Sequence, residues 1–312
     1  SFDVVAIDDS GAGNNTSAPV ETVTITLTGT NDQPEISFIT QTGDAIEADG
    51  LAPLTATGQI TWDDLDANDT VTITPTYNDD ITWSGGTPAE LEAELSVAEI
   101  SALTSVGGID PAFSITSSAP GEQDGWQYSA AQNLDFLRLG ETLTLSFNVV
   151  AIDDSAAIDG SDTSEPPKVV TITITGTNDR PVISFIQDTG AANEADGAAR
   201  LTATGQITWD DLDANDIVTI TPTYNGDITW SGGTPAELDA ELSAAEIDAL
   251  TTAAFSITST NGGDQNGWQY SAAQNLDFLR NGETLTLSFD VVAIDDSGAG
   301  NNTSAPVETV TI

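Results

Sequence analysis

The sequence contains no cysteine, no histidine and no methionine. Disulfide bonds are therefore excluded, and so are metal sites built from thiolate or imidazole ligands. Any metal site in this chain has to use oxygen ligands, which select hard cations such as Ca²⁺. The lack of cysteine does not assign a compartment, since secreted bacterial proteins and cytosolic proteins can both lack it.

Basic residues are also scarce, because 5 Lys and Arg face 50 Asp and Glu and give a net charge of −45. This charge argues against nucleic acid or an anionic membrane as a partner, since both are polyanions. It fits cation binding or an acidic, solvated surface. No apolar run approaches 18 residues, so no membrane insertion is expected. Hydrophobic residues make up 38% of the chain, which is enough for a folded core.

Internal repetition is the strongest signal in the sequence. Residues 1–25 recur letter for letter as residues 288–312, and LTATGQITWDDLDAND at 54–69 recurs at 201–216. The opening SFDVVAIDD is typical of the interior of a domain and no signal peptide precedes it, so we expect a part of a longer chain. With boundaries at GTNDQP and GTNDRP, we predict the C-terminal strands of a preceding repeat (1–30), a complete repeat (31–177) and a second repeat with a truncated last strand (178–312).

Most segments of a repeat have the composition of β-strands, being rich in Thr, Val and Ile. Seven short strands separated by turn signals predict an all-β fold of tandem immunoglobulin- or cadherin-like β-sandwiches. In the complete repeat these strands are expected at 34–39, 58–64, 70–77, 113–117, 125–129, 141–153 and 168–176.

One segment of each repeat differs. TPAELEAELSVAEISAL at 87–103 begins with Thr87, Pro88 and Glu90, which predict an N-cap, a first-turn proline and a capping box. Ser96 and Glu99 repeat the capping signal. We therefore expect one or two short helices inserted between strands and packed on the sandwich. A partner-binding role for this insert is the weaker alternative.

Acidic residues gather at the predicted ends of strands. Strand directions in a sandwich place the turn DDLDAND, the segment AIDDS and the linker TND at the end where a repeat begins. The segments EADG and NLDFLRLGE lie at the opposite end, which a tandem array sets against the start of the next repeat. Arg138 and Arg280, which follow NLDFL, are expected to pair with a local acid or to cap that turn.

The segments GWQYSAAQNLDFLRNGETLTLSFDVVAIDDS and VETVTITLTGTNDQP resemble the VCBS repeat of large bacterial surface proteins. The matching features are a Trp-x-Tyr strand, a Gly-Glu-Thr-Leu turn, a Val-rich strand that ends in Asp, and a closing Thr-Gly-Thr-Asn-Asp-x-Pro. The resemblance implies a cadherin-like module in the tandem extender region of an RTX-type adhesin of a Gram-negative bacterium. Cadherins hold calcium between domains with an Asn-Asp linker, an Asp-x-Asp turn and acids of the preceding domain, and TND and DLD match that pattern piecewise.

We therefore predict that two or more Ca²⁺ ions bind at each junction between repeats and stiffen it, because Ca²⁺ takes six to eight oxygen ligands. Within the TWDDLDAND segment, Asp64 and Asp66 are the preferred ligands. The full set of candidate metal ligands is Asp8, Asp9, Asn31, Asp32, Glu47, Asp49, Asp63, Asp64, Asp66, Asp69, Asp135, Glu141, Asp153, Asp154, Asn178, Asp179, Glu194, Asp196, Asp210, Asp211, Asp213, Asp216, Asp295 and Asp296.

Other interpretations of these residues stay open at this point. DDLDAND can be a turn with solvated charge, since Asp and Asn bond nearby backbone. An EF-hand is disfavoured because its sixth position holds Asp69 instead of Gly and its twelfth holds Pro75 instead of Glu. The Trp residues can form a sugar-binding platform, but each has an apolar neighbour two residues away, which favours a place in the core. Paired carboxylates can serve a glycosidase, but copies of one active site along one chain disfavour catalysis.

The sequence thus predicts a non-enzymatic spacer on the bacterial cell surface, with adjacent repeats as its partners and no small-molecule substrate. It would hold a distal ligand-binding region away from the cell. The alternative is an adhesion module that itself binds a sugar or a protein.

Overall fold

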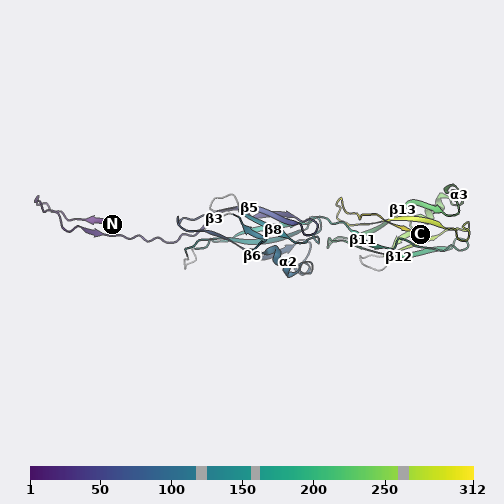
Figure 1. Ribbon diagram of the computed structural model, residues 1–312, viewed down its shortest axis with the longest axis horizontal. Helices are drawn as coiled ribbons and strands as arrows, with labels where there is room; N and C mark the ends of the chain where they lie inside the picture. The colour runs from purple at the N-terminus through teal and green to yellow at the C-terminus, as the bar shows by residue number, and fades with distance from the viewer. Residues whose placement is uncertain (117–124, 156–161, 259–266) are drawn as a thin grey trace.

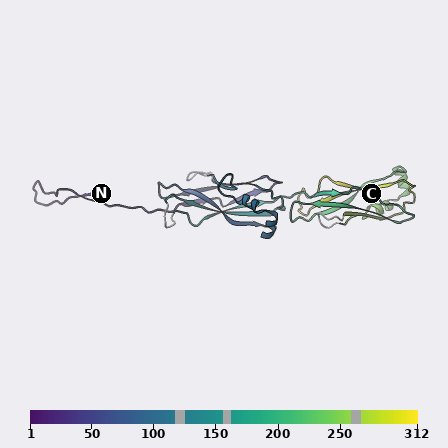
Figure 2. The same ribbon diagram turned by 60° about the horizontal axis from the view of Figure 1, so that its bottom comes forward.

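The computed structural model covers the whole chain, and the structure describes residues 1–116, 125–155, 162–258 and 267–312. Two β-sandwiches follow one another along the long axis of the molecule, and an extended N-terminal tail precedes them (Figures 1 and 2). Each sandwich has its own hydrophobic core. The prediction of tandem β-sandwiches with a helical insert in each is confirmed.

Two four-stranded sheets form the first sandwich. The strand orders are β3-β5-β8-β7 and β4-β10-β9-β6. The first sheet contains β3 (Glu35–Ile39), β5 (Pro53–Asp63), β8 (Gly125–Ala131) and β7 (Phe113–Ile115). The second contains β4 (Thr42–Ile46), β10 (Lys168–Thr175), β9 (Thr142–Ile152) and β6 (Thr72–Trp83).

Strand β4 was not predicted from the sequence. After β3 the chain crosses to the other sheet, where β4 runs parallel to β10 with Thr42 opposite Thr171. Gly43 permits this crossing, because a Cβ atom there would lie 2.7 Å from the Trp126 ring. The predicted strands are otherwise present, with Ser117 outside the described residues. Two extend further than expected: β5 begins at Pro53, and β6 continues past an irregularity between Tyr77 and Ile81.

The second sandwich repeats this plan. Its sheets have the orders β11-β12-β15-β14 and β13-β16-β17. The first sheet contains β11 (Val182–Ile186), β12 (Arg200–Asp210), β15 (Gly267–Ala273) and β14 (Phe255–Ile257). The second contains β13 (Thr219–Trp230), β16 (Leu285–Ile294) and β17 (Glu308–Thr311). In the tail, β1 (Phe2–Val4) pairs antiparallel with β2 (Glu21–Val23).

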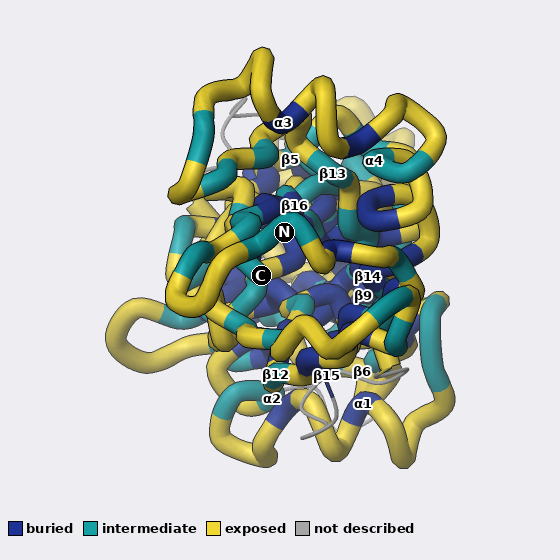
Figure 3. The backbone as a smooth tube through the Cα atoms, turned by 90° about the vertical axis from the view of Figure 1, so that its right-hand side faces the viewer, coloured by how far each residue is buried: buried dark blue, intermediate teal, exposed yellow. Residues whose placement is uncertain are grey.

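The helical inserts are confirmed as two short helices in each sandwich. These are α1 (Pro88–Glu94) and α2 (Val97–Thr104) in the first, and α3 (Pro235–Glu241) and α4 (Ala244–Thr251) in the second. The predicted capping boxes are present, since Thr87 pairs with Glu90 and Ser96 with Glu99. Seen along the long axis, α3 and α4 lie on the opposite side of the molecule from α1 and α2 (Figure 3).

The tryptophans belong to the cores, as their spacing predicts. Trp62, Trp126, Trp209 and Trp268 are at most 5% exposed, Trp83 is 7% exposed, and Trp230 is partly buried against its core. The indole N–H of Trp126 donates to the Thr40 carbonyl at 2.9 Å, which satisfies its single polar atom. Buried residues line the interior of each sandwich and exposed ones its surface (Figure 3). These buried rings cannot provide a sugar-stacking platform.

Candidate metal centre at the repeat junction

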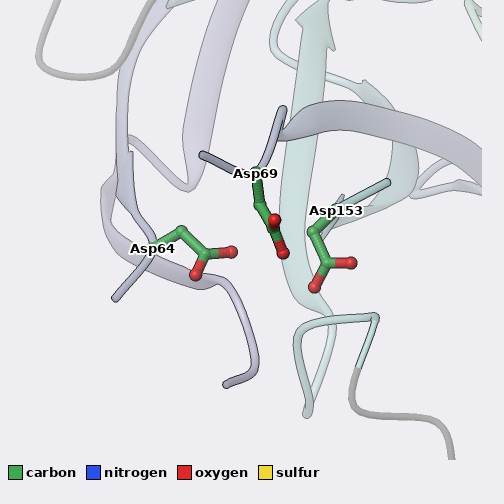
Figure 4. A group of neighbouring side chains, drawn as sticks. All are labelled: Asp64, Asp69 and Asp153. Carbon is green, nitrogen blue, oxygen red and sulfur yellow. The ribbon is translucent and has the colours of Figure 1, made fainter. Parts of the chain in front are cut away.

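Three aspartates meet at the N-terminal end of the first sandwich. Asp64 and Asp69 lie in the loop between β5 and β6, and Asp153 directly follows β9 (Figure 4). Their carboxylate oxygens lie within 4.8 Å of one another. Strands β5 and β9 belong to different sheets, so it is the stacking of the sheets that joins these residues.

The linker completes this end of the sandwich. The side-chain amide of Asn31 donates to Asp153 Oδ2 at 3.2 Å, and the backbone N–H of Asp32 donates to Asp66 Oδ2 at 2.7 Å. Asp154 Oδ1 accepts from the backbone N–H of Thr70 at 2.9 Å. The predicted convergence of the three segments is therefore confirmed.

The positions of the aspartates in the TWDDLDAND segment differ from the sequence-based choice of Asp64 and Asp66 as the preferred ligands. Asp69 joins Asp64 in the group of three, while Asp66 holds the linker backbone. Asp63 is exposed, and its Oδ1 accepts from the backbone N–H of Asp64 at 3.0 Å. Asp63 therefore lies at the rim of the cluster and shapes its loop.

The second sandwich carries the same group in Asp211, Asp216 and Asp295, again within 4.8 Å of one another. Asp179 takes the place of Asp32, and its backbone N–H donates to Asp213 Oδ2 at 2.8 Å. The Asn178 amide donates to Asp295 Oδ2 at 3.3 Å. Asp210 is exposed like Asp63.

This second group differs in having the first sandwich against it. Glu47, which follows β4, is 2% exposed, and its Oε2 accepts from the backbone N–H of Thr177 at 3.0 Å and from its hydroxyl at 2.8 Å. Asp135 Oδ1 accepts from the backbone N–H of Gly50 at 2.8 Å, which positions the EADG turn. The charges of Glu47, Asp49 and Asp135 all act on Asp179. The second predicted convergence, between the end of one repeat and the start of the next, is therefore confirmed.

Several buried oxygens at this junction have no hydrogen-bond donor among the described residues. Leaving such an atom unpaired costs about 1–3 kcal/mol, and more when it carries charge. Cations satisfy carboxylate oxygens without a donor, and an all-oxygen donor set fits Ca²⁺. These atoms include Glu47 Oε1, Asn178 Oδ1, Asp179 Oδ2, Asp211 Oδ2 and Asp213 Oδ1.

The pKa values of these carboxyl groups reflect the same crowding. Burial, with the charges of Asp135, Glu47 and Asp49 added, raises the pKa of Asp179 to about 7. Burial also raises the pKa of Asp211 to about 6. It raises that of Asp213 to about 8, although the hydrogen bond from Asp179 opposes the shift. Near neutral pH Asp179 and Asp213 therefore retain a proton for a large part of the time unless a cation takes its place.

Arg138 brings a positive charge of the chain itself to the junction. The Arg138 guanidinium forms an ion pair with Asp216, whose side chain is fully buried, and donates to Asp296 Oδ1 at 2.7 Å. The expectation of a local partner was wrong, because both partners belong to the next sandwich. Burial and the nearby Asp295 and Asp296 charges still raise the pKa of Asp216 and outweigh Arg138, which lowers it.

Direct hydrogen bonds accompany this ion pair. The Asn215 amide donates to the Gly85 carbonyl at 3.0 Å and to Glu141 Oε1 at 2.9 Å. The backbone N–H of Ala214 donates to the Phe136 carbonyl at 3.2 Å. Glu141, a predicted metal ligand, also accepts from the Trp83 indole through Oε2 at 2.9 Å, so both of its oxygens have donors. Part of the junction is therefore a direct protein contact.

The remaining predicted ligands are exposed. At the far end of the second sandwich, Glu194 and Asp196 are exposed, and so is Asp277, the counterpart of Asp135. Asp8 and Asp9 lie exposed in the tail, where Asp8 Oδ1 accepts from the backbone N–H of Ser10 at 2.9 Å.

The sequence interpretation missed Thr177, Asn215 and Asn301. Asn301 donates to the Asn178 carbonyl at 2.7 Å and thereby braces the linker. The copied letters DLDAND already contain Asn215, but only the facing sandwich gives it a partner.

No family model matches the chain, and no curated protein matches it. Among solved structures, the cadherin-like domains 1 to 4 of zebrafish RET are similar at 13% identity over 90% of this chain and 50% of theirs, with a TM-score of 0.27. Cadherin domains 1–4 of protocadherin gamma B7 are similar at 15% identity over 90% of this chain and 49% of theirs, with a TM-score of 0.33. An I-band fragment of titin is similar at 6% identity over 89% of this chain and 64% of its own, with a TM-score of 0.30.

This chain thus spans about half the length of the two cadherin-like structures. At these identities the similarity concerns the fold alone. The fold described above rests on the strand pairing of this chain and not on these comparisons. Over the described part of the chain, none of the helices combines the length and apolar character needed to cross a bilayer.

Proposed function

We propose that this chain is a structural extender module of a large bacterial surface adhesin, in which Ca²⁺ bound at and between repeats stiffens the array. Its repeats would be 31–177 and 178–312, with 1–30 as the last strands of a preceding repeat. Adjacent repeats are its partners, and it holds a distal ligand-binding region away from the cell. The VCBS-like letters of each repeat support this assignment. The observation that carries the calcium part is the set of buried oxygens without donors at the junction.

Both sandwiches would contribute to the cation site. Glu47 and Asp135 come from the first, and Asp179 and Asp213 come from the second. A Ca²⁺ ion takes oxygen ligands at about 2.3–2.6 Å. An ion held from both sides replaces mutual repulsion with a shared attraction, so bending the junction then requires loss of ligands. The group Asp211, Asp216 and Asp295 would hold a second ion next to the first.

Length and rigidity are what a spacer requires, and the sandwich supplies both. Strand β9 has 11 residues, and at a rise of about 3.3 Å per residue it spans about 36 Å. Each added repeat would therefore extend the array by several nanometres. Copying a junction is compatible with this role because every joint has the same task.

The test is a calorimetric titration of calcium into chelator-treated protein, paired with small-angle scattering. We expect calcium uptake below millimolar concentration, and a shorter maximum dimension and more bending after chelation. Asp213→Asn should weaken binding, because it removes a charge from a site where charge count sets affinity. Asp227→Asn is the control, since Asp227 is an exposed residue of β13 and lies away from the junction. No uptake at millimolar Ca²⁺, or identical scattering in both conditions, would refute the proposal.

A further inference from the structure

Each sandwich carries one phenylalanine on its surface instead of in its core. Phe38 and Phe185 occupy the same position of the segment ISFI in the two repeats, and each is 52% exposed. Phe38 belongs to β3, an outer strand of its sheet, and lies opposite Thr61 of β5. Since Thr61 precedes the buried Trp62, side chains at its position point away from the core. The ring of Phe38 therefore lies on the outer face of the sheet.

A local irregularity of β3 turns this ring outward. Regular alternation would place Ile36 and Phe38 on one face, yet Ile36 is 2% exposed and belongs to the core. The register shifts between these two residues, at Ser37, and it shifts at the same place in β11. The Ser37 hydroxyl lies 3.0 Å from Thr61 Oγ1, and the corresponding contact in the second sandwich measures 2.9 Å. Bulges of this kind re-aim side chains, and here both copies expose a ring that the hydrophobic effect alone would bury.

From this ring towards the C-terminal end of the sandwich, the sheet face carries no charge, although the chain has 50 acidic residues. Thr57 lies opposite Gln127, and Thr55 lies opposite Ser129. The second sandwich repeats these residues in the same register, as Thr202, Thr204, Gln269 and Ser271. Charged residues border the face only at the ends of its strands, namely Glu35 and Asp63 in the first sandwich and Arg200 and Asp210 in the second.

Beside the ring the face is hollowed and rich in groups that form hydrogen bonds. A hollow of about 570 Å³ is lined by Thr40, Thr57, Gln59 and Gln127. Within the described residues the side chains of Thr57, Gln59 and Gln127 have no hydrogen-bond partner, so they are available to donate and to accept. From Thr61 to Thr57 the strand rises by about 13 Å, at about 3.3 Å per residue. The ring and these groups thus extend over the length of an oligosaccharide rather than of a single sugar.

A neutral carbohydrate is the class of ligand that fits this face. The C–H face of a sugar ring packs on an aromatic ring, and its hydroxyl groups exchange hydrogen bonds with amides and hydroxyls. Acidic polysaccharides are disfavoured, because the net charge of the chain is −45. A protein interface requires a core of several apolar side chains, whereas here one ring lies among polar groups.

We propose that each repeat binds a neutral polysaccharide on this sheet face, with Phe38 and Phe185 stacking on sugar rings and Gln59 and Gln206 forming hydrogen bonds. Strands β5 and β12 lie on opposite sides of the long axis, so the two faces point in opposite directions (Figures 1 and 3). One chain therefore binds two separate polysaccharide strands and links them. This function is additional to that of a spacer and does not depend on calcium.

The test is native electrophoresis of the full chain in gels that contain dextran, laminarin or galactomannan. We expect at least one of these neutral polysaccharides to slow the protein, and anionic alginate to leave its mobility unchanged. Phe38→Ala combined with Phe185→Ala should abolish the retardation and keep the wild-type melting temperature, since both rings are about half exposed. Val97→Ala is the control, because Val97 is an 85% exposed residue of α2, and it should be slowed like the wild type. Unchanged mobility in all three neutral gels, or equal retardation of the double variant and the wild type, would overturn the proposal.

Calorimetry with oligosaccharides of the most strongly retarding polysaccharide counts the sites. We expect two sites in the wild type and one in either Phe38→Ala or Phe185→Ala. Adding Gln59→Ala to Phe185→Ala should weaken the remaining site by about tenfold, through loss of a hydrogen bond. Two sites in both single variants would refute the assignment. So would a mass from light scattering that rises with concentration in the wild type and not in the double variant, because the face would then join copies of the chain.

Discussion

Replacing Arg138 tests whether the junction is held by protein contacts as well as by cations. Arg138 is the basic side chain that pairs with acids of the second sandwich, namely Asp216 and Asp296. Arg138→Gln keeps most of the side-chain length and removes the charge. Arg280→Gln is a matched control, since Arg280 occupies the same position in the other repeat and its side chain is exposed with no ion pair among the described residues.

The magnitude follows from burial. A hydrogen bond to a charged group contributes about 1.5–3 kcal/mol, and that range applies to the Asp216 pair because the Asp216 side chain is fully buried. The Asp296 side chain is 45% exposed, so solvent screening reduces its share to at most about 1 kcal/mol. Without calcium, Arg138→Gln should therefore destabilise the closed junction by about 2 kcal/mol. That corresponds to about a 30-fold change in the ratio of closed to open junctions.

The same substitution should have the opposite effect on calcium binding, which it should strengthen. Arg138 and a cation in the Asp211, Asp216 and Asp295 group share Asp216. Removing the guanidinium frees that carboxylate and removes a repulsive charge, so the calcium affinity of this group should rise. The variant should thus be looser than the wild type after chelation and bind calcium more tightly.

The assay is a distance distribution from pulsed electron resonance, with spin labels at Glu92→Cys and Asp239→Cys. These positions correspond to one another on α1 and α3, both are exposed, and the chain supplies no competing thiol. In chelator, Arg138→Gln should broaden the distribution, while Arg280→Gln should leave it unchanged. Equal distributions for both variants and the wild type would refute the view that Arg138 holds the junction.

Three further predictions concern pH and the core of the first sandwich. In chelator, the raised pKa values of Asp179, Asp211 and Asp213 make the junction most stable in acid, and that stability is lost as pH rises through about 6 to 8. The distribution of distances between the two spin labels should therefore broaden between pH 5 and pH 8. Saturating calcium should suppress this pH dependence. Gly58→Ala should destabilise the first sandwich by about 1–3 kcal/mol in a urea melt, because its Cβ would lie 2.3 Å from the Trp126 ring, whereas Gly13→Ala meets open space and should have little effect. Tyr128→Phe removes the hydroxyl that donates to the Leu103 carbonyl at 3.1 Å and should cost about 1 kcal/mol, with Tyr77→Phe, whose ring is only partly buried, as the milder comparison.

Much of the fold could be predicted because its signals are local. Alternation of apolar residues marks each strand face, so Ile60 and Trp62 are both buried as their spacing requires. The capping boxes at Thr87 and Ser96 depend on residues three positions apart. Strand β4 could not be found in this way, since Gly43 and Asp44 have turn composition and only pairing with β10 makes them a strand.

We could predict four features from the sequence: the repeats, the core faces, the oxygen-only chemistry of any metal site and the ends of the sandwich where acids gather. Strand direction was sufficient for that last point, because it follows from the order of elements along the chain. Which charged side chains are neighbours is visible only in the folded chain: Asp69 rather than Asp66 joins Asp64, and Arg138 reaches Asp216 and Asp296 of the next sandwich. Burial, too, differs between identical segments, since Phe289 is buried and Phe2 is exposed. The physical reason is that burial and contact between distant segments depend on what packs beside a strand, and the letters of the strand do not encode that neighbour.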